Sequence, residues 1–145
     1  MEQPVFTSIF YADDDIDDLD FFKEVAAEIN EPVTLFEEGQ KLLTQLHNPP
    51  PNASVIFLDL NMPVKSGFQV LEEIKANPAI RNIPVVILTT SINPADIELC
   101  KNLGANLYVR KPASIAGLRR AVGYVLSIDW INYNPTDKEF VYQPY

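Results

Sequence analysis

Cysteine, histidine and basic residues are scarce in this chain. Its 145 residues include one cysteine, one histidine and 11 lysines and arginines, against 20 acidic residues. The single cysteine, Cys100, excludes an internal disulfide, and we expect it to be a small apolar residue on a helix. The net charge of −9 repels the phosphates of nucleic acids and anionic lipids, so we expect the partner to be a protein.

Long apolar runs are also missing. No stretch approaches the length of a membrane span. Residues 1–4 are not a basic start followed by an apolar stretch, so no signal peptide is expected. These absences predict a cytoplasmic protein that binds neither membrane nor nucleic acid.

The chain does contain enough apolar sequence for one folded domain. Its hydrophobic fraction is 47%, and a domain of this size buries roughly two thirds of its unfolded surface. Strand-like and helix-like segments alternate, which implies an α/β fold whose parallel sheet is covered on both faces. We predict five strands, at 8–12, 32–36, 54–58, 85–88 and 105–109, and five helices, at 17–29, 40–46, 67–76, 95–103 and 115 to about 127.

Polar residues follow four of these strands at the point where each strand ends. They are Asp13 with Asp14, Asp59, Thr89 and Lys111. Ligands of open parallel sheets bind beyond the carboxyl ends of the strands, so these side chains are expected to meet in one crevice. Carboxylates suit a hard divalent cation, whereas a lysine and a hydroxyl suit a phosphoryl group. The sequence therefore predicts a site for both.

This order of residues resembles the response-regulator receiver domain of two-component signalling, over about residues 7–127. That family has an acidic pair after strand one, a phosphoacceptor aspartate after strand three, Thr or Ser after strand four and Lys-Pro after strand five. The segment Leu-Asp-Leu-Asn-Met-Pro around Asp59, with Gly67 at the position of the loop glycine, is similar to stand-alone receivers paired with bacterial phytochrome-type kinases. The resemblance implies a flavodoxin-like, doubly wound sheet.

The resemblance also implies a phosphoryl-transfer chemistry. Asp59 would accept a phosphoryl group from a histidine kinase or phosphotransfer protein, as an acyl phosphate. Mg²⁺ would be bound by Asp13, Asp14, Asp59 and the backbone carbonyl of Asn61. Such a protein is a phosphoacceptor and not an enzyme that turns over external substrates.

Three further residues would carry the signal outward. By the same resemblance, Lys111 and Thr89 would bind the phosphoryl oxygens, and Tyr108 would be an aromatic switch that turns inward behind Thr89. The output surface would be the fourth helix, fifth strand and fifth helix, which would contact a downstream protein or a second copy of the chain in a homodimer.

Residues 1–128 are expected to form the receiver domain, with no separate effector domain. Residues 129–145 are expected to be a tail that either lies over the domain surface or stays loose. The alternative is a partner-binding motif, because aromatic residues recur in the tail, namely Trp130, Tyr133, Phe140, Tyr142 and Tyr145.

The other charged residues near these strand ends are given plainer roles. We expect Asp17, Asp18 and Asp20 to form a solvated helix face that compensates the helix dipole, and we leave open whether Asp15 touches the metal. Lys65 and Arg110 would add positive charge near the site.

Three alternatives to a phosphorylated receiver share part of this pattern. Residues 13–24 reproduce most of the register of an EF-hand calcium loop, but Asp18 stands where that loop requires glycine. Aspartate-nucleophile phosphohydrolases carry a second aspartate two residues after the nucleophile, where this chain has Asn61. A phosphorylation-independent binding module, or a phosphate sink, of the same fold remains an alternative.

Overall fold

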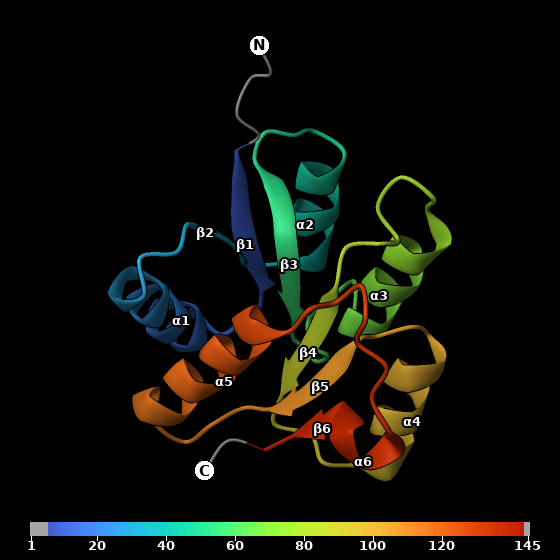
Figure 1. Ribbon diagram of the computed structural model, residues 1–145. Helices are drawn as coiled ribbons and strands as arrows, with labels where there is room; N and C mark the ends of the chain where they lie inside the picture. Colours follow the sequence, from blue (N-terminus) through green and yellow to red (C-terminus); the bar gives the residue numbers. More distant parts are fainter. Residues whose placement is uncertain (1–5, 144–145) are drawn as a thin grey trace.

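A parallel sheet of six strands forms the centre of the molecule in the computed structural model, which describes residues 6–143 (Figure 1). The elements are β1 (Thr7–Ala12), α1 (Ile16–Glu28), β2 (Val33–Phe36), α2 (Gly39–Leu46), β3 (Asn52–Leu58), α3 (Gly67–Ala76), β4 (Val85–Thr89), α4 (Pro94–Asn102), β5 (Leu107–Arg110), α5 (Ile115–Ser127), α6 (Asp137–Phe140) and β6 (Val141–Tyr142). The prediction of a doubly wound parallel α/β fold is confirmed.

The strand order β2-β1-β3-β4-β5-β6 shows where a crevice can form at the edge of the sheet. The chain moves to one side from β1 to β2, and to the other side from β3 to β6, so the direction reverses between β1 and β3. At such a switch point the carboxyl ends of the two strands open into a crevice. Ala12 pairs with Leu58, and the N–H of Asp59 donates to the carbonyl of Ala12 at 3.1 Å, so Asp13 and Asp59 emerge together.

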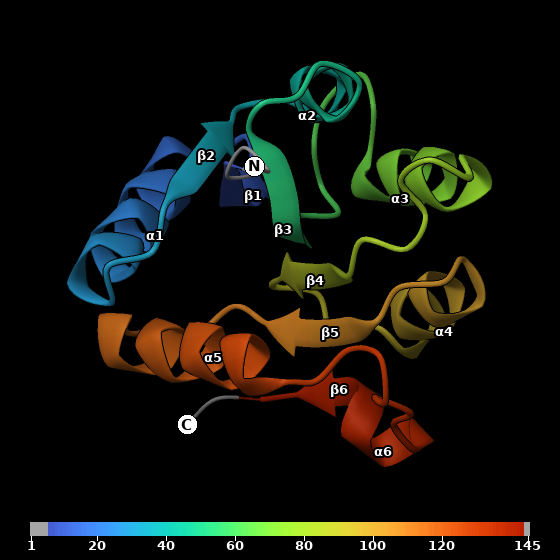
Figure 2. The same ribbon diagram turned by 45° about the horizontal axis from the view of Figure 1, so that its top comes forward.

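The helices cover the two faces of the sheet. Figure 2 shows α1 and α5 on one face, and α2, α3 and α4 on the other. Each face has its own apolar cluster, because alternate side chains of the central strands point to opposite sides. Phe10 and Ile56 belong to the cluster under α2 to α4, whereas Tyr11 and Phe57 belong to the one under α1 and α5. Burial on both faces explains the nearly continuous apolar strands of the sequence.

The tail contributes one strand and one helix beyond the predicted five of each. α6 begins with a capping box between Thr136 and Glu139, and β6 then pairs in parallel with the outer edge of β5. Phe140 is only 3% exposed and its ring lies 6.4 Å from that of Tyr108. The tail is therefore packed against the fold at Phe140 and β6, although this strand is only two residues long. Tyr145 and residues 1–4 lie outside the described residues.

Helix starts differ slightly from expectation. α1 begins at Ile16, because the Asp15 carboxylate accepts the N–H groups of Asp17 and Asp18 and caps the helix.

In residues 6–143, no helix is both long enough and apolar enough to cross a membrane.

Candidate functional site

Three carboxylates gather at the crevice between β1 and β3. Oxygen atoms of Asp13, Asp14 and Asp59 all lie within 4.8 Å of one another. Asp13 and Asp59 are buried, whereas Asp14 is exposed. Burial, together with the nearby charge of Asp13, raises the pKa of Asp59 to about 7, although Lys111 opposes this shift. A partly exposed group of hard oxygen ligands fits a divalent cation, which would relieve the repulsion among these carboxylates.

The protein itself partly compensates the buried charge of Asp13. Its Oδ2 accepts the Tyr11 hydroxyl at 2.5 Å and lies 2.8 Å from the Lys111 ammonium, while its Oδ1 accepts the N–H of Asp15 at 2.9 Å. Burial and the Asp13 charge both raise the pKa of Tyr11, so this phenol remains a donor. The Asp13 carboxylate is therefore held in a fixed position by three hydrogen-bond donors.

Lys111 lies close to three acidic side chains, those of Asp13, Asp18 and Asp59. Its backbone N–H donates to the carbonyl of Thr89 at 2.7 Å, which ties the end of β5 to that of β4. Its ammonium lies 2.8 Å from oxygen atoms of both Asp13 and Asp18, and 3.7 Å from Asp59 Oδ1. Burial disfavours the charged ammonium, but the hydrogen bonds to these carboxylates raise the pKa of Lys111 overall. It therefore stays positively charged beside Asp59.

Asp18 differs from the prediction of a solvated helix face. Its carboxylate is only 32% exposed and binds Lys111 across the gap between α1 and the chain after β5. A signal was present in the sequence, because Asp18 precedes the buried Phe22 by one helical turn and so lies toward the core side of α1. Asp17 and Asp20 are exposed, in agreement with the prediction.

Among the ion pairs of residues 6–143, none joins Lys65 or Arg110 to Asp13, Asp14 or Asp59. Lys65 Nζ donates to Glu73 at 2.6 Å and to Gln40 at 3.0 Å, so it belongs to the side of α2 and α3. Arg110 is the exposed residue of β5.

The loop after Asp59 passes so close to α3 that only glycine fits at position 67. A Cβ atom on Gly67 would lie 2.1 Å from the carbonyl oxygen of Asp59, and the Gly67 N–H donates to the Leu60 carbonyl at 2.9 Å. Asn61 is exposed within this loop, two residues after Asp59. The loop is therefore anchored beside the carboxylates by backbone contact.

Thr89 and Tyr108 both contact Ser91, in the loop between β4 and α4. Thr89 is fully buried at the end of β4, and its hydroxyl oxygen accepts the Ser91 N–H at 3.4 Å. Tyr108 is 1% exposed, and its hydroxyl donates to the Ser91 carbonyl at 2.9 Å. Ser91 thus connects the two side chains, so a displacement of Thr89 would reach Tyr108 through this one residue.

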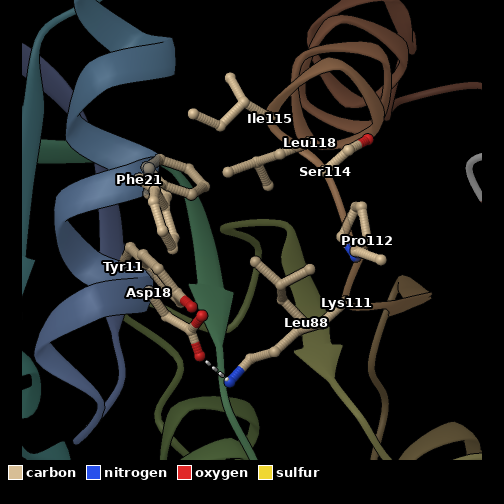
Figure 3. Close-up of a pocket in the computed structure, with 11 residues that line it drawn as sticks. Tyr11, Asp18, Phe21, Leu88, Lys111, Pro112, Ser114, Ile115 and Leu118 are labelled. Carbon is tan, nitrogen blue, oxygen red and sulfur yellow. Dashed lines mark hydrogen bonds and ion pairs between the residues drawn. The ribbon is translucent and has the colours of Figure 1, made fainter.

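A cavity of about 290 Å³ opens beside Lys111, between α1 and α5 (Figure 3). Asp18 and Lys111 form its polar end, and Phe21, Ile115 and Leu118 contribute apolar walls. Ala113 also lines it.

Comparison with known proteins identifies the family. The family model of the response regulator receiver domain matches residues 9–123. The chain belongs to this family. Receiver domains accept a phosphoryl group on an aspartate, bind a divalent metal at an acidic pocket and interact with histidine kinases or phosphotransfer proteins and with downstream targets. They are typically not enzymes that turn over external substrates.

The matching relatives include cyanobacterial phytochrome response regulators. Response regulator Rcp1 of Synechocystis is 45% identical over 72 residues, which are 50% of this chain and 49% of that protein. The phosphorylated cyanobacterial phytochrome response regulator RcpA is 30% identical, with a TM-score of 0.76 over 91% of this chain and 98% of RcpA. The Mn²⁺-bound form of Rcp1 has 29% identity and a TM-score of 0.74, over 92% and 100% of the two chains. The sequence matches span about half the length of curated relatives such as Rcp1.

Proposed function

We propose that this receiver domain accepts a phosphoryl group on Asp59, in a Mg²⁺-dependent reaction, from a histidine kinase or phosphotransfer protein. The observation that carries the proposal is the position of Asp59, whose carboxylate lies within 4.8 Å of Asp13 and Asp14 oxygens and 3.7 Å from Lys111 Nζ. These distances support the proposal, because a nucleophile at Asp59 would have ligands for a cation and an ammonium for phosphoryl oxygens close by.

The proposed transfer conserves atoms and charge. A lone pair of an Asp59 oxygen forms the new P–O bond while the P–N bond of the donor phosphohistidine breaks, and the imidazole nitrogen keeps that electron pair. Bound Mg²⁺, held by Asp13, Asp14, Asp59 and the backbone carbonyl of Asn61, would neutralise charge on the phosphoryl oxygens. Lys111 donates to one of these oxygens and the Thr89 hydroxyl donates to another.

The proposed output passes from Thr89 to Tyr108. When Thr89 turns toward the phosphoryl group, it pulls Ser91 in the same direction. The carbonyl of Ser91 accepts the Tyr108 hydroxyl at 2.9 Å, so Tyr108 is displaced as well. The Tyr108 ring contacts Phe140 of the tail, so the surface that changes includes α6 and β6 as well as α4, β5 and α5. A downstream protein, or a second copy in a homodimer, would bind this surface.

Phosphorylation of Asp59 is tested with acetyl phosphate and intact-mass spectrometry. We expect one phosphoryl group on the wild-type protein with Mg²⁺, and none when Mg²⁺ is chelated. Asp59→Asn should abolish labelling, because the amide keeps the shape of the side chain but lacks the attacking carboxylate. Asp20→Asn, an exposed change of the same kind, is the matched control. Equal labelling of Asp59→Asn and wild type would refute the proposal.

A further inference from the structure

We propose that Asp18 is a positioning residue that holds Lys111 for phosphoryl transfer to Asp59. This inference rests on the proposed function and assigns to the site a carboxylate outside the trio that could hold the metal. Figure 3 shows Asp18 reaching from α1 to Lys111, which follows β5. The two are 93 residues apart in the sequence.

The geometry around the Lys111 ammonium carries the argument. Asp13 and Asp18 each lie 2.8 Å from Nζ, which is hydrogen-bonding distance, whereas Asp59 Oδ1 at 3.7 Å is beyond it. Because the ammonium nitrogen is tetrahedral, hydrogen bonds from two of its N–H groups also fix the direction of the third N–H group. Lys111 is thus held near Asp59 without a direct hydrogen bond to it, so the ammonium itself does not occupy a lone pair of the attacking carboxylate.

Asp18 holds the Lys111 ammonium in a way that Asp13 cannot do alone. Asp13 is one of the three carboxylates available to a cation, so its bond to Lys111 competes with metal binding. Asp18 lies outside this trio, so it can keep its bond to Lys111 whether Asp13 binds the cation or Lys111. Without Asp18, the flexible lysine stem would let the ammonium bind Asp59 directly and occupy the attacking oxygen.

The test compares Asp18→Asn with Asp17→Asn. Both changes remove one acidic charge from the first turn of α1, but Asp17 is exposed and only Asp18 binds Lys111. At saturating Mg²⁺ and fixed acetyl phosphate, we expect Asp18→Asn to be labelled about tenfold more slowly than wild type, because a misplaced group costs rate steeply. The half-saturating Mg²⁺ concentration should change by less than about twofold, since a change of tenfold would mean lost binding. In this reaction Asp59 forms the P–O bond and acetate leaves with the electrons of the broken bond.

A double-mutant cycle gives a second readout without metal. Urea unfolding of Asp18→Asn, Lys111→Met and the double variant in chelator should show non-additive stabilities, because the first change removes the partner of the second. In the Lys111→Met background, Asp18→Asn should not slow labelling further.

The outcomes separate this inference from the proposed function. If wild type is labelled on Asp59 but Asp18→Asn and Asp17→Asn react at equal rates, the positioning role is refuted and the proposed function stands. Additive stabilities, or slower labelling caused by Asp18→Asn even in the Lys111→Met background, would also refute it. If no protein carrying Asp59 is labelled, the proposed function fails and this inference fails with it.

Discussion

At the scale of single residues, the site keeps a buried carboxylate, Asp59, at a cost in stability. Asp59 is 4% exposed and lies near the charge of Asp13, and these two conditions raise its pKa to about 7. Asp13 has three donors around it, from Tyr11, Lys111 and Asp15, whereas Lys111 remains 3.7 Å from Asp59. Asp59 is therefore the less compensated of the two buried carboxylates.

The pH dependence of stability should report this cost. A carboxyl group whose folded pKa exceeds its unfolded value of 3.8 binds more protons when folded, so its ionisation destabilises the fold as pH rises. In metal-free protein, we expect Asp59 to lower the free energy of unfolding between about pH 4 and pH 7. Asp59→Asn should remove this decline and stabilise the protein at pH 7.5 by about 1 to 3 kcal/mol. Urea unfolding across this pH range measures both effects, with Asp20→Asn as the control; parallel profiles for Asp59→Asn and wild type would contradict the argument.

At the scale of elements, short loops and helix ends hold the site residues in place. The backbone of the loop after β3 approaches α3 at Gly67, and the capping box of Ser66 and Gln69 fixes the start of that helix. The Asp15 side chain caps α1 by accepting the N–H groups of Asp17 and Asp18, just after Asp13 and Asp14. The positions of the carboxylates therefore depend on backbone geometry as well as on the neighbouring side chains.

Two glycines give a matched test of this point. Gly67→Ala places a methyl group 2.1 Å from the Asp59 carbonyl oxygen, so the loop must shift, and we expect a loss of about 2 to 4 kcal/mol. Gly123→Ala lies on α5 with no heavy atom within 4 Å of the new methyl group, and should instead stabilise by about 0.5 to 1 kcal/mol. Denaturant unfolding of the two variants decides the matter, and an equal effect of both would show that the close approach at Gly67 does not matter.

The tail elements give a second test at this scale. Phe140 is 3% exposed against Tyr108, so Phe140→Ala should destabilise the protein by about 3 kcal/mol, through lost burial and a cavity. Ile131 is 94% exposed in the same tail, and Ile131→Ala should change stability by no more than about 0.5 kcal/mol. Thermal unfolding monitors both, and a Phe140→Ala variant as stable as wild type would show that α6 contributes little to the fold.

At the scale of the whole molecule, the crevice and the far edge of the sheet are linked through packed residues. Thr89 and Tyr108 share Ser91, Tyr108 contacts Phe140, and β6 extends the sheet beyond β5. A displacement of Thr89 at the crevice therefore has a chain of contacts that leads to the tail. Such coupling requires that the activator bind one conformation better than another, by about 1 to 3 kcal/mol.

Beryllofluoride, a phosphoryl mimic, tests this route with Mg²⁺ present. We expect amide signals of Ser91, Tyr108 and Val141 to shift in NMR spectra, in addition to signals around Asp59. Asp59→Asn with the same additions is the control and should show no shift at Tyr108 or Val141. If the wild-type shifts stay confined to the residues around Asp59, the link to the tail is absent and the protein is better described as a phosphate sink.

The sequence by itself determined the layered fold and the carboxyl-end cluster. Alternating apolar strands and helices permit few topologies, and polar residues at the ends of parallel strands must lie at one edge of the sheet. Asp13, Asp14, Asp59, Thr89 and Lys111 were found in this way, because each follows a strand that periodicity alone locates.

Only the tertiary structure decided the partners that come from distant segments. Asp18 has the sequence pattern of a helix-start acid, and its bond to Lys111 depends on how α1 and the chain after β5 approach each other. The strand β6 is two residues long and carries almost no signal of its own, so it forms because the edge of β5 offers unpaired backbone groups and Phe140 can be buried beside Tyr108. The local apolar pattern indicates the five predicted strands and five predicted helices, whereas β6 and the Asp18–Lys111 contact depend on the packing of elements far apart in the chain.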